Sequence, residues 1–128
     1  MVTPKHWKDE PDEHDYPAAE DYLSLLMPPA SADALVAQLR AAPMIRRKAK
    51  DLLRASALPL LPTDNPHVVK DLKKVKDGDF LSPVLIVRGH VARGHPLLIA
   101  DGYHRVCASY HLDEDAAIPC RITDMTDT

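Results

Sequence analysis

The chain has 128 residues, a formal net charge of −3 at pH 7, 12 prolines and two cysteines. This length allows one domain with a hydrophobic core that needs no disulfide or structural metal, and two cysteines do not make a disulfide framework. The sequence shows neither a signal peptide nor an apolar run of about 20 residues, so we expect a cytoplasmic protein that does not cross a membrane.

The charges are unevenly distributed along the chain. Residues 1–21 hold seven acidic and two basic residues, whereas residues 43–76 hold nine basic and three acidic ones. The first of these segments has no apolar periodicity before Tyr22, so we expect residues 1–21 to form a mobile or loosely docked acidic arm. A solvated tail explains this composition more simply than a mimic of an anionic ligand.

A helical extension is expected over residues 22–56. Of three predicted helices, the first runs from Pro17 to about Met27, the second is capped by Ser31, and the third begins at Pro43. The third helix is amphipathic, and its basic face holds Arg46, Arg47, Lys50 and Arg54. This face either covers the core with its aliphatic stems or contacts phosphate or a partner.

Residues 57–128 are expected to form the main domain, in one compact unit with the helical extension. Apolar runs bounded by turn residues predict four short strands: residues 58–61, 83–88, 96–100 and 118–123. Helical spacing predicts two helices, residues 66–76, with Asn65 as the cap, and residues 103–111. The expected fold class is therefore α/β (α+β): a small, mixed, twisted sheet with flanking helices and an N-terminal helical layer.

One short motif carries most of the functional information. An apolar run ends at Asp101-Gly102, and the chain continues with Tyr103, His104 and Arg105. This order predicts a strand, a tight turn and the start of a helix. The first turn of a helix has unpaired N–H groups and partial positive charge, and glycine lets the backbone approach a ligand closely. We therefore predict that Gly102, Tyr103, His104 and Arg105 bind a nucleotide or phosphate.

The motif resembles the signature of the ParB/sulfiredoxin superfamily, and the resemblance covers residues 57–123. In that superfamily the strand ends in Asp-Gly-Glu-Arg-Arg in partition proteins, in Gly-Cys-His-Arg in sulfiredoxins, and in a sequence like Asp-Gly-His-His-Arg in free-serine kinases. The resemblance implies that ATP or another nucleotide is bound there, with Thr63 and Asp64 near the same pocket. Resemblance to the kinases implies that Asp101 holds Mg²⁺ or positions a hydroxyl, while His104 can donate to a phosphate oxygen or move a proton.

The chain departs from two branches of this superfamily. Tyr103 replaces the sulfiredoxin cysteine, and a phenol cannot act as a thiolate, so reduction of sulfinic acids is not expected. Where partition proteins have Glu-Arg, this chain has Tyr103-His104. The helix-turn-helix and dimerisation region of partition proteins would have to follow residue 123, and only five residues do. The chain is also acidic overall and lacks the basic stripe of nucleic-acid modules, so a nucleic-acid partner is not expected.

Three functions remain open at this point. The first is a nucleotide-dependent phosphotransferase for a small hydroxyl substrate, with Asp101 and His104 as catalytic residues. The second is a non-catalytic regulatory module that binds a nucleotide, phosphate or, with less support, a nucleic acid, and responds to its ligand through the extra helices. The third is a partner-binding protein in which the motif is only a turn, Asp101 a helix cap and Arg105 a solvated side chain. A homodimer is compatible with each of them.

Overall fold

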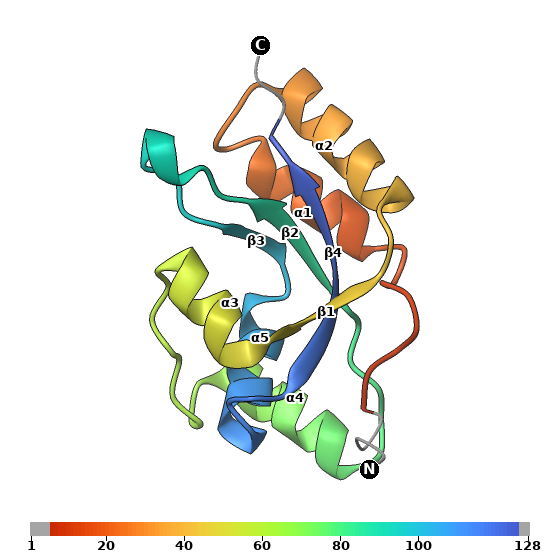
Figure 1. Cartoon of the computed structure of the whole chain (residues 1–128). Coiled ribbons are helices and arrows are strands. Elements are labelled where there is room, and N and C mark those ends of the chain that lie inside the picture. The colour runs from red at the N-terminus through yellow and green to blue at the C-terminus, as the bar shows by residue number, and fades with distance from the viewer. Residues whose placement is uncertain (1–5, 126–128) are drawn as a thin grey trace.

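A computed structural model describes residues 6–125 and has a mixed α/β architecture (Figure 1). The elements, in chain order, are α1 (Asp15–Leu23), α2 (Pro29–Ala41), β1 (Ile45–Lys48), α3 (Ala49–Ser56), α4 (Pro66–Lys76), β2 (Val84–Arg88), a 3₁₀ turn (Val91–Arg93), β3 (Leu98–Asp101), α5 (Tyr103–Leu112) and β4 (Ala117–Asp124). The predicted fold class, a small mixed sheet with flanking helices, is confirmed. Within the part of the chain that the structure describes, no helix combines the length and apolar character needed to span a bilayer.

The four strands form one sheet in the order β1-β4-β2-β3. β2 and β4 run parallel to each other at the centre, and the two outer strands are antiparallel to their neighbours. All four residues of the run Val84–Val87 in β2 are buried, as expected for a central strand covered on both faces.

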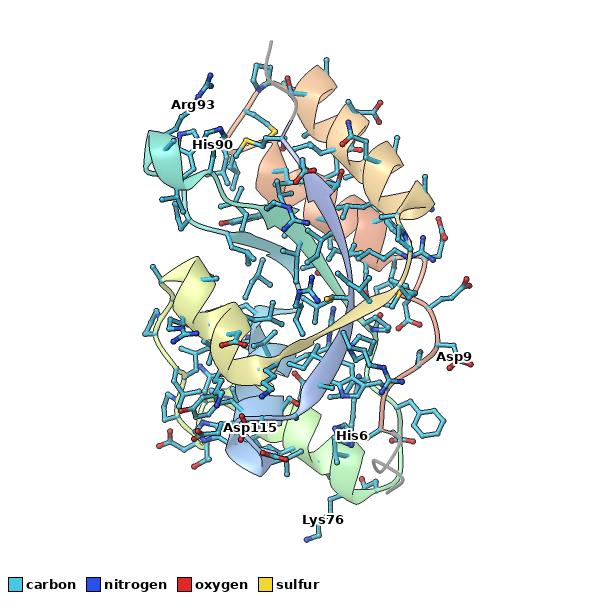
Figure 2. All side chains as sticks on the ribbon, viewed as in Figure 1. His6, Asp9, Lys76, His90, Arg93 and Asp115 are labelled. Atoms are coloured by element: carbon cyan, nitrogen blue, oxygen red, sulfur yellow. The ribbon has the colours of Figure 1, made fainter. Side chains whose placement is uncertain are left out.

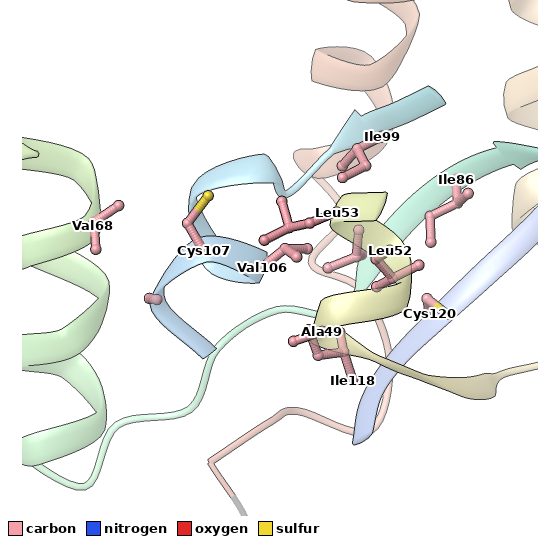
Figure 3. Packing of buried hydrophobic residues seen from close by; sticks show 12 residues of the cluster. Ala49, Leu52, Leu53, Val68, Ile86, Ile99, Val106, Cys107, Ile118 and Cys120 are labelled. Carbon is pink, nitrogen blue, oxygen red and sulfur yellow. The ribbon is translucent and has the colours of Figure 1, made fainter. Parts of the chain in front are cut away.

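Helices cover both faces of this sheet because side chains along a strand alternate between them. On one face, Leu85 and Val87 of β2 pack with the apolar residues of α1 and α2, which form the N-terminal helical layer. On the other face, Val84 and Ile86 pack with α3 and α5, and α4 lies against α5 (Figures 1 and 3). The core therefore consists of two apolar clusters separated by the sheet.

One strand comes from the segment predicted as the third helix. Ile45–Lys48 form β1, paired with β4, and only Ala49–Ser56 are helical. The prediction of a helix from Pro43 is wrong for these four residues because the open edge of β4 satisfies their backbone groups. The predicted basic helix face is accordingly divided: Arg46 and Arg47 lie on the edge strand, whereas Lys50 and Arg54 lie on α3 beside Asp115 and Asp51.

Residues 58–61, predicted as the first strand, instead form an irregular connection between α3 and α4. Pro59 within this segment and Pro62 directly after it have no N–H group to donate to a strand ladder. Its carbonyl groups accept hydrogen bonds from α5, because the Tyr103 hydroxyl donates to Pro59 O and His111 Nε2 lies 2.7 Å from Leu61 O. Side chains of α5 thus replace the strand partner that the prediction assumed.

The N-terminal segment is docked rather than loose over the residues that the structure describes. α1 begins at Asp15, and Asp15, Tyr16 and Ala19 are buried against the sheet. Before α1, Trp7 pairs with Leu81, so the expectation of a loosely docked arm is wrong for residues 6–21. Residues 1–5 of the predicted arm lie outside the described residues.

Helix boundaries follow the local capping signals in one case and depart from them in another. The Asn65 side chain accepts hydrogen bonds from the backbone N–H groups of His67 and Val68, at 3.0 and 3.3 Å, so the predicted cap of α4 is confirmed. In α2, Pro28 occupies the N-cap position and Ser31 lies in the first turn. The prediction that Ser31 caps this helix is therefore wrong, because Pro29 already starts it.

Candidate functional site

The Asp101-Gly102-Tyr103 motif forms the predicted strand, turn and helix start. β3 ends at Asp101, α5 begins at Tyr103, and Gly102 between them has a φ of 112°. A Cβ at Gly102 would lie 2.9 Å from both Arg105 Nη2 and a methyl carbon of Val84. Glycine is therefore required here by the backbone conformation and by the close packing of this chain's own side chains, whereas the prediction assigned that space to a ligand.

Arg105 is held in a set of internal contacts. Its Nη2 donates to Asp101 Oδ2 at 2.7 Å and lies 3.4 Å from both Asp15 Oδ2 and the Pro83 carbonyl oxygen. Its buried Nε has no hydrogen-bond partner among the described residues. With 18% of the side chain exposed, Arg105 is not the solvated residue of the third hypothesis. Asp101 is not the helix cap that this hypothesis assumes. Its carboxylate pairs with Arg105, and Gly102 occupies the N-cap position of α5.

Asp15, which is not among the predicted site residues, is brought to Arg105 by α1 from 90 positions away in the chain. Asp15 is only 3% exposed, and the Ser82 hydroxyl donates to its carboxylate. Ser82 in turn accepts from the backbone N–H of Asp12 at 2.9 Å. No local pattern marks Asp15, because its role depends on the docking of α1 against the end of β3.

A polar cleft of about 280 Å³ opens between α4 and the start of α5. Its lining consists of His14, His67, Lys70, Asp71, Lys74, Asp101, Gly102, His104 and Arg105. The structure thus joins four of the predicted site residues to a stripe on α4. The spacing of that stripe, at positions 67, 70, 71 and 74, is the helical signal that would have identified it.

Two histidines face each other in this cleft. The rings of His67 and His104 lie with their centroids 4.4 Å apart. Burial lowers the pKa of His104, and His67 and Arg105 lower it further, while Asp71 opposes them. His104 is therefore held neutral at pH 7, with one ring nitrogen able to accept a proton and the other able to donate a hydrogen bond.

The carboxyl group of Asp101 is perturbed in the opposite direction. Burial raises its pKa, the Arg105 guanidinium opposes this change, and the nearby carboxylate of Asp15 adds to it. Burial and like charge thus both favour the protonated form, while the ion pair favours the charged one. The pKa of Asp101 is thus raised and that of His104 is lowered, and perturbed pKa values of this kind are common at functional sites.

Three of the predicted site residues do not place their side chains in the cleft. The Tyr103 hydroxyl points to Pro59, which leaves only its main-chain N–H at the first turn of α5. Thr63 and Asp64 are exposed in the turn that precedes α4 and do not line the cleft. That turn is closed by the Asn65 N–H, which donates to the Pro62 carbonyl, so it leads directly into the helix.

A metal at Asp101 would need ligands from outside the protein. Among residues 6–125, no three histidine, cysteine, aspartate or glutamate side chains are grouped so that they could hold a metal ion. Mg²⁺ keeps several non-protein ligands when it accompanies phosphate groups, so the predicted role of Asp101 is compatible with one carboxylate ligand.

A second cavity, of about 410 Å³, is larger but less suited to polar chemistry. It is lined by Leu26, Met27, Ser31, Leu35, His95, Pro96, Leu98 and Met125. It lies beside the β2–β3 connection, where His90 and Arg93 are labelled in Figure 2, and it contains a single titratable side chain. The polar cleft is therefore the candidate site.

Comparisons of the chain with protein-family models, with curated proteins and with solved structures found no match. The resemblance to the ParB/sulfiredoxin superfamily accordingly stays a prediction, and the candidate site stands on its own geometry.

Asp71 is the most unusual residue of the cleft. It is 8% exposed, and neither a hydrogen bond nor an ion pair of its carboxylate is found among the described residues. Burial raises its pKa, although Arg105, Lys74 and His104 oppose this electrostatically. Its carboxylate lines the open cleft, and the nearby cations of Arg105, Lys74 and Lys70 partly offset the cost of its burial.

We predict that Arg105→Ala lowers the free energy of unfolding by about 3–5 kcal/mol, because it leaves two carboxylates without their cation. Urea denaturation at pH 7 measures this change. Arg54→Ala removes an exposed guanidinium that pairs with Asp51 at 2.9 Å and should cost less than about 1 kcal/mol. Equal effects of the two variants would show that the buried contacts of Arg105 do not stabilise the fold.

We also predict a pH-dependent gain in stability for Asp71→Asn. Because the folded-state pKa of Asp71 is raised above the ordinary value of 3.8, the parent loses stability as pH rises through that folded-state pKa. Asparagine does not titrate, so its contribution to stability does not change with pH. The difference in unfolding free energy between variant and parent should therefore grow in favour of the variant from pH 4 to pH 7. A difference that shrinks with pH in urea titrations would contradict the assignment.

Proposed function

We propose that this chain binds a nucleotide or another phosphate-bearing ligand in the cleft between α4 and the start of α5. The convergence of Lys70, Lys74 and Arg105 with the N-terminus of α5 carries this proposal. The two lysines stand one helical turn apart on the face of α4 that lines the cleft, and Arg105 lies in the first turn of α5. The resemblance to the ParB/sulfiredoxin superfamily gives the same expectation.

The electrostatics of the cleft favour an anion. Its lining has three permanent cations and two carboxylates, and one of these carboxylates, Asp101, is already paired with Arg105. The first turn of α5 holds no acidic residue, and Gly102 at the N-cap has no side chain that could occupy the free N–H groups. These groups and the helix dipole are therefore available to phosphate oxygens.

The size of the cleft suits part of a nucleotide. Pockets for drug-sized ligands have volumes of about 300–1,000 Å³, and this cleft, at about 280 Å³, is slightly smaller. It can accommodate phosphate groups and a few neighbouring atoms, so the base of a nucleotide would lie outside it.

We predict that the double variant Lys70→Ala/Lys74→Ala binds nucleotide about 10²- to 10⁴-fold more weakly than the parent. Each lysine loses roughly one hydrogen bond to a charged group, and about 1.4 kcal/mol corresponds to a factor of ten. Calorimetric titrations with ATP, ADP and CTP, with and without Mg²⁺, measure the affinity, and thermal shifts provide an independent readout.

The matched control is Lys73→Ala/Lys76→Ala, which removes the same charge from the same helix. Neither of these lysines lines the cleft; Lys73 pairs with Asp77, and Lys76 points away from the body of the molecule (Figure 2). Its affinity should stay within about twofold of the parent value, since distant charges are screened by salt. Equal losses in both double variants would place the ligand elsewhere, and a parent that binds none of these ligands would favour a partner-binding role.

A second candidate function is phosphoryl transfer from the nucleotide to a small hydroxyl compound. The positions of Asp101 and His104 in the cleft favour it, because a carboxylate paired with Arg105 and an imidazole with a lowered pKa lie close to where a hydroxyl could lose its proton. Asp101 would position the hydroxyl or a Mg²⁺ that accompanies the phosphates, and His104 would donate to a phosphate oxygen.

We predict that Asp101→Asn abolishes such transfer while it largely preserves nucleotide binding. Asparagine keeps an oxygen that can accept from Arg105, so the cleft retains its shape, but the negative charge is lost. ATP consumption over a panel of small hydroxyl compounds measures the turnover. If the parent consumes no ATP with any of them, the chain is a binding module and the catalytic roles of Asp101 and His104 are excluded.

A further inference from the structure

Asp71 places a carboxylate without a hydrogen-bond partner among the described residues in a cleft whose other features attract anions. Phosphate alone would bind better without it, because its charge opposes that of the ligand. A carboxylate that opposes a bare anion and receives no hydrogen bond from the protein is explained by a ligand that donates one to it.

The position of Asp71 provides that explanation. On α4 it lies one turn from His67 and next to Lys70 in the same stripe, so it borders the space where phosphate groups would lie. Its carboxylate has no donor within the described residues, so it can accept a hydrogen bond from a bound molecule. From the facing elements, His104, Arg105 and Asp101 line the same space.

From this arrangement, and resting on the proposed function, we propose that Asp71 selects ligands that carry a hydroxyl group close to the phosphate. The class is that of small phosphomonoesters of polyhydroxy compounds, or the equivalent part of a larger phosphate ester. The cleft volume of about 280 Å³ fits a phosphate with a few carbon and oxygen atoms.

A hydroxyl donor fits better than a cationic one. Lys70, Lys74 and Arg105 surround the space in front of Asp71, and these cations would repel an ammonium group on the ligand. A neutral hydroxyl donates one hydrogen bond without adding positive charge, and its bond to a carboxylate is charge-assisted.

Two ligands that differ only in their hydroxyl groups test this proposal. Glycerol 1-phosphate and n-propyl phosphate have the same number of carbon atoms and the same phosphate monoester. Calorimetric titration of the parent should show about tenfold to hundredfold tighter binding of glycerol 1-phosphate, the range that one hydrogen bond to a charged group gives.

Asp71→Leu should abolish this preference and bind n-propyl phosphate more tightly than the parent does, because the opposing charge is gone. Asp71→Asn keeps an acceptor and should retain part of the preference for glycerol 1-phosphate. If circular dichroism shows that the leucine variant is unfolded, the asparagine variant decides the test. Asp64→Leu removes an exposed carboxylate that does not line the cleft, so the ratio of the two affinities should equal that of the parent.

The outcomes separate this proposal from the proposed function. If inorganic phosphate binds the parent but the two esters bind equally, the role of Asp71 is refuted and phosphate binding stands. If Asp71→Leu and Asp71→Asn change both affinities by the same factor, Asp71 acts only through its charge and the proposal is refuted. If the parent binds neither the esters nor inorganic phosphate, both proposals fail.

Discussion

The buried contact of the Arg105 guanidinium with the carboxylates of Asp101 and Asp15 joins segments that are far apart in the sequence. It connects α1, the end of β3 and the first turn of α5, and the Pro83 carbonyl adds the entry to β2. Ions that are taken out of water must be paired, so these elements can be docked together only when the whole cluster is formed. The position of α1 and the floor of the candidate site therefore depend on the same contact.

This constraint changes how the roles are divided within the site. Arg105, the residue that the motif suggested as the main phosphate ligand, already shares its Nη2 between two carboxylates. The lysines on α4 are not bound in this way within the described structure, and they border the cleft from the other side. Arg105 thus organises the start of α5, while Lys70 and Lys74 supply the accessible positive charge for the proposed ligand.

Predictions from the sequence succeeded where neighbouring residues decide the structure. Asn65 caps α4 because its side chain reaches the N–H groups two and three positions ahead, and Gly102 allows the turn between β3 and α5 through its own φ. The prediction of a helix over Ile45–Lys48 failed because the edge of β4, more than 65 residues further along the chain, provides hydrogen-bond partners for these residues. Local patterns contain no information about such a partner.

The sequence by itself determined the fold class, three of the four strands, the boundaries of α4, the start of α5, and the strand, turn and helix start from Asp101 to Arg105. These features follow from periodicity, capping and turn chemistry, which act over a few residues. Only the tertiary structure decided that Asp15 pairs with Arg105, that the α4 stripe completes the cleft, and that Asp71 lies there without a partner. The reason is physical: ion pairing and burial depend on distances in space, which separations of 30 to 90 residues along the chain do not reveal.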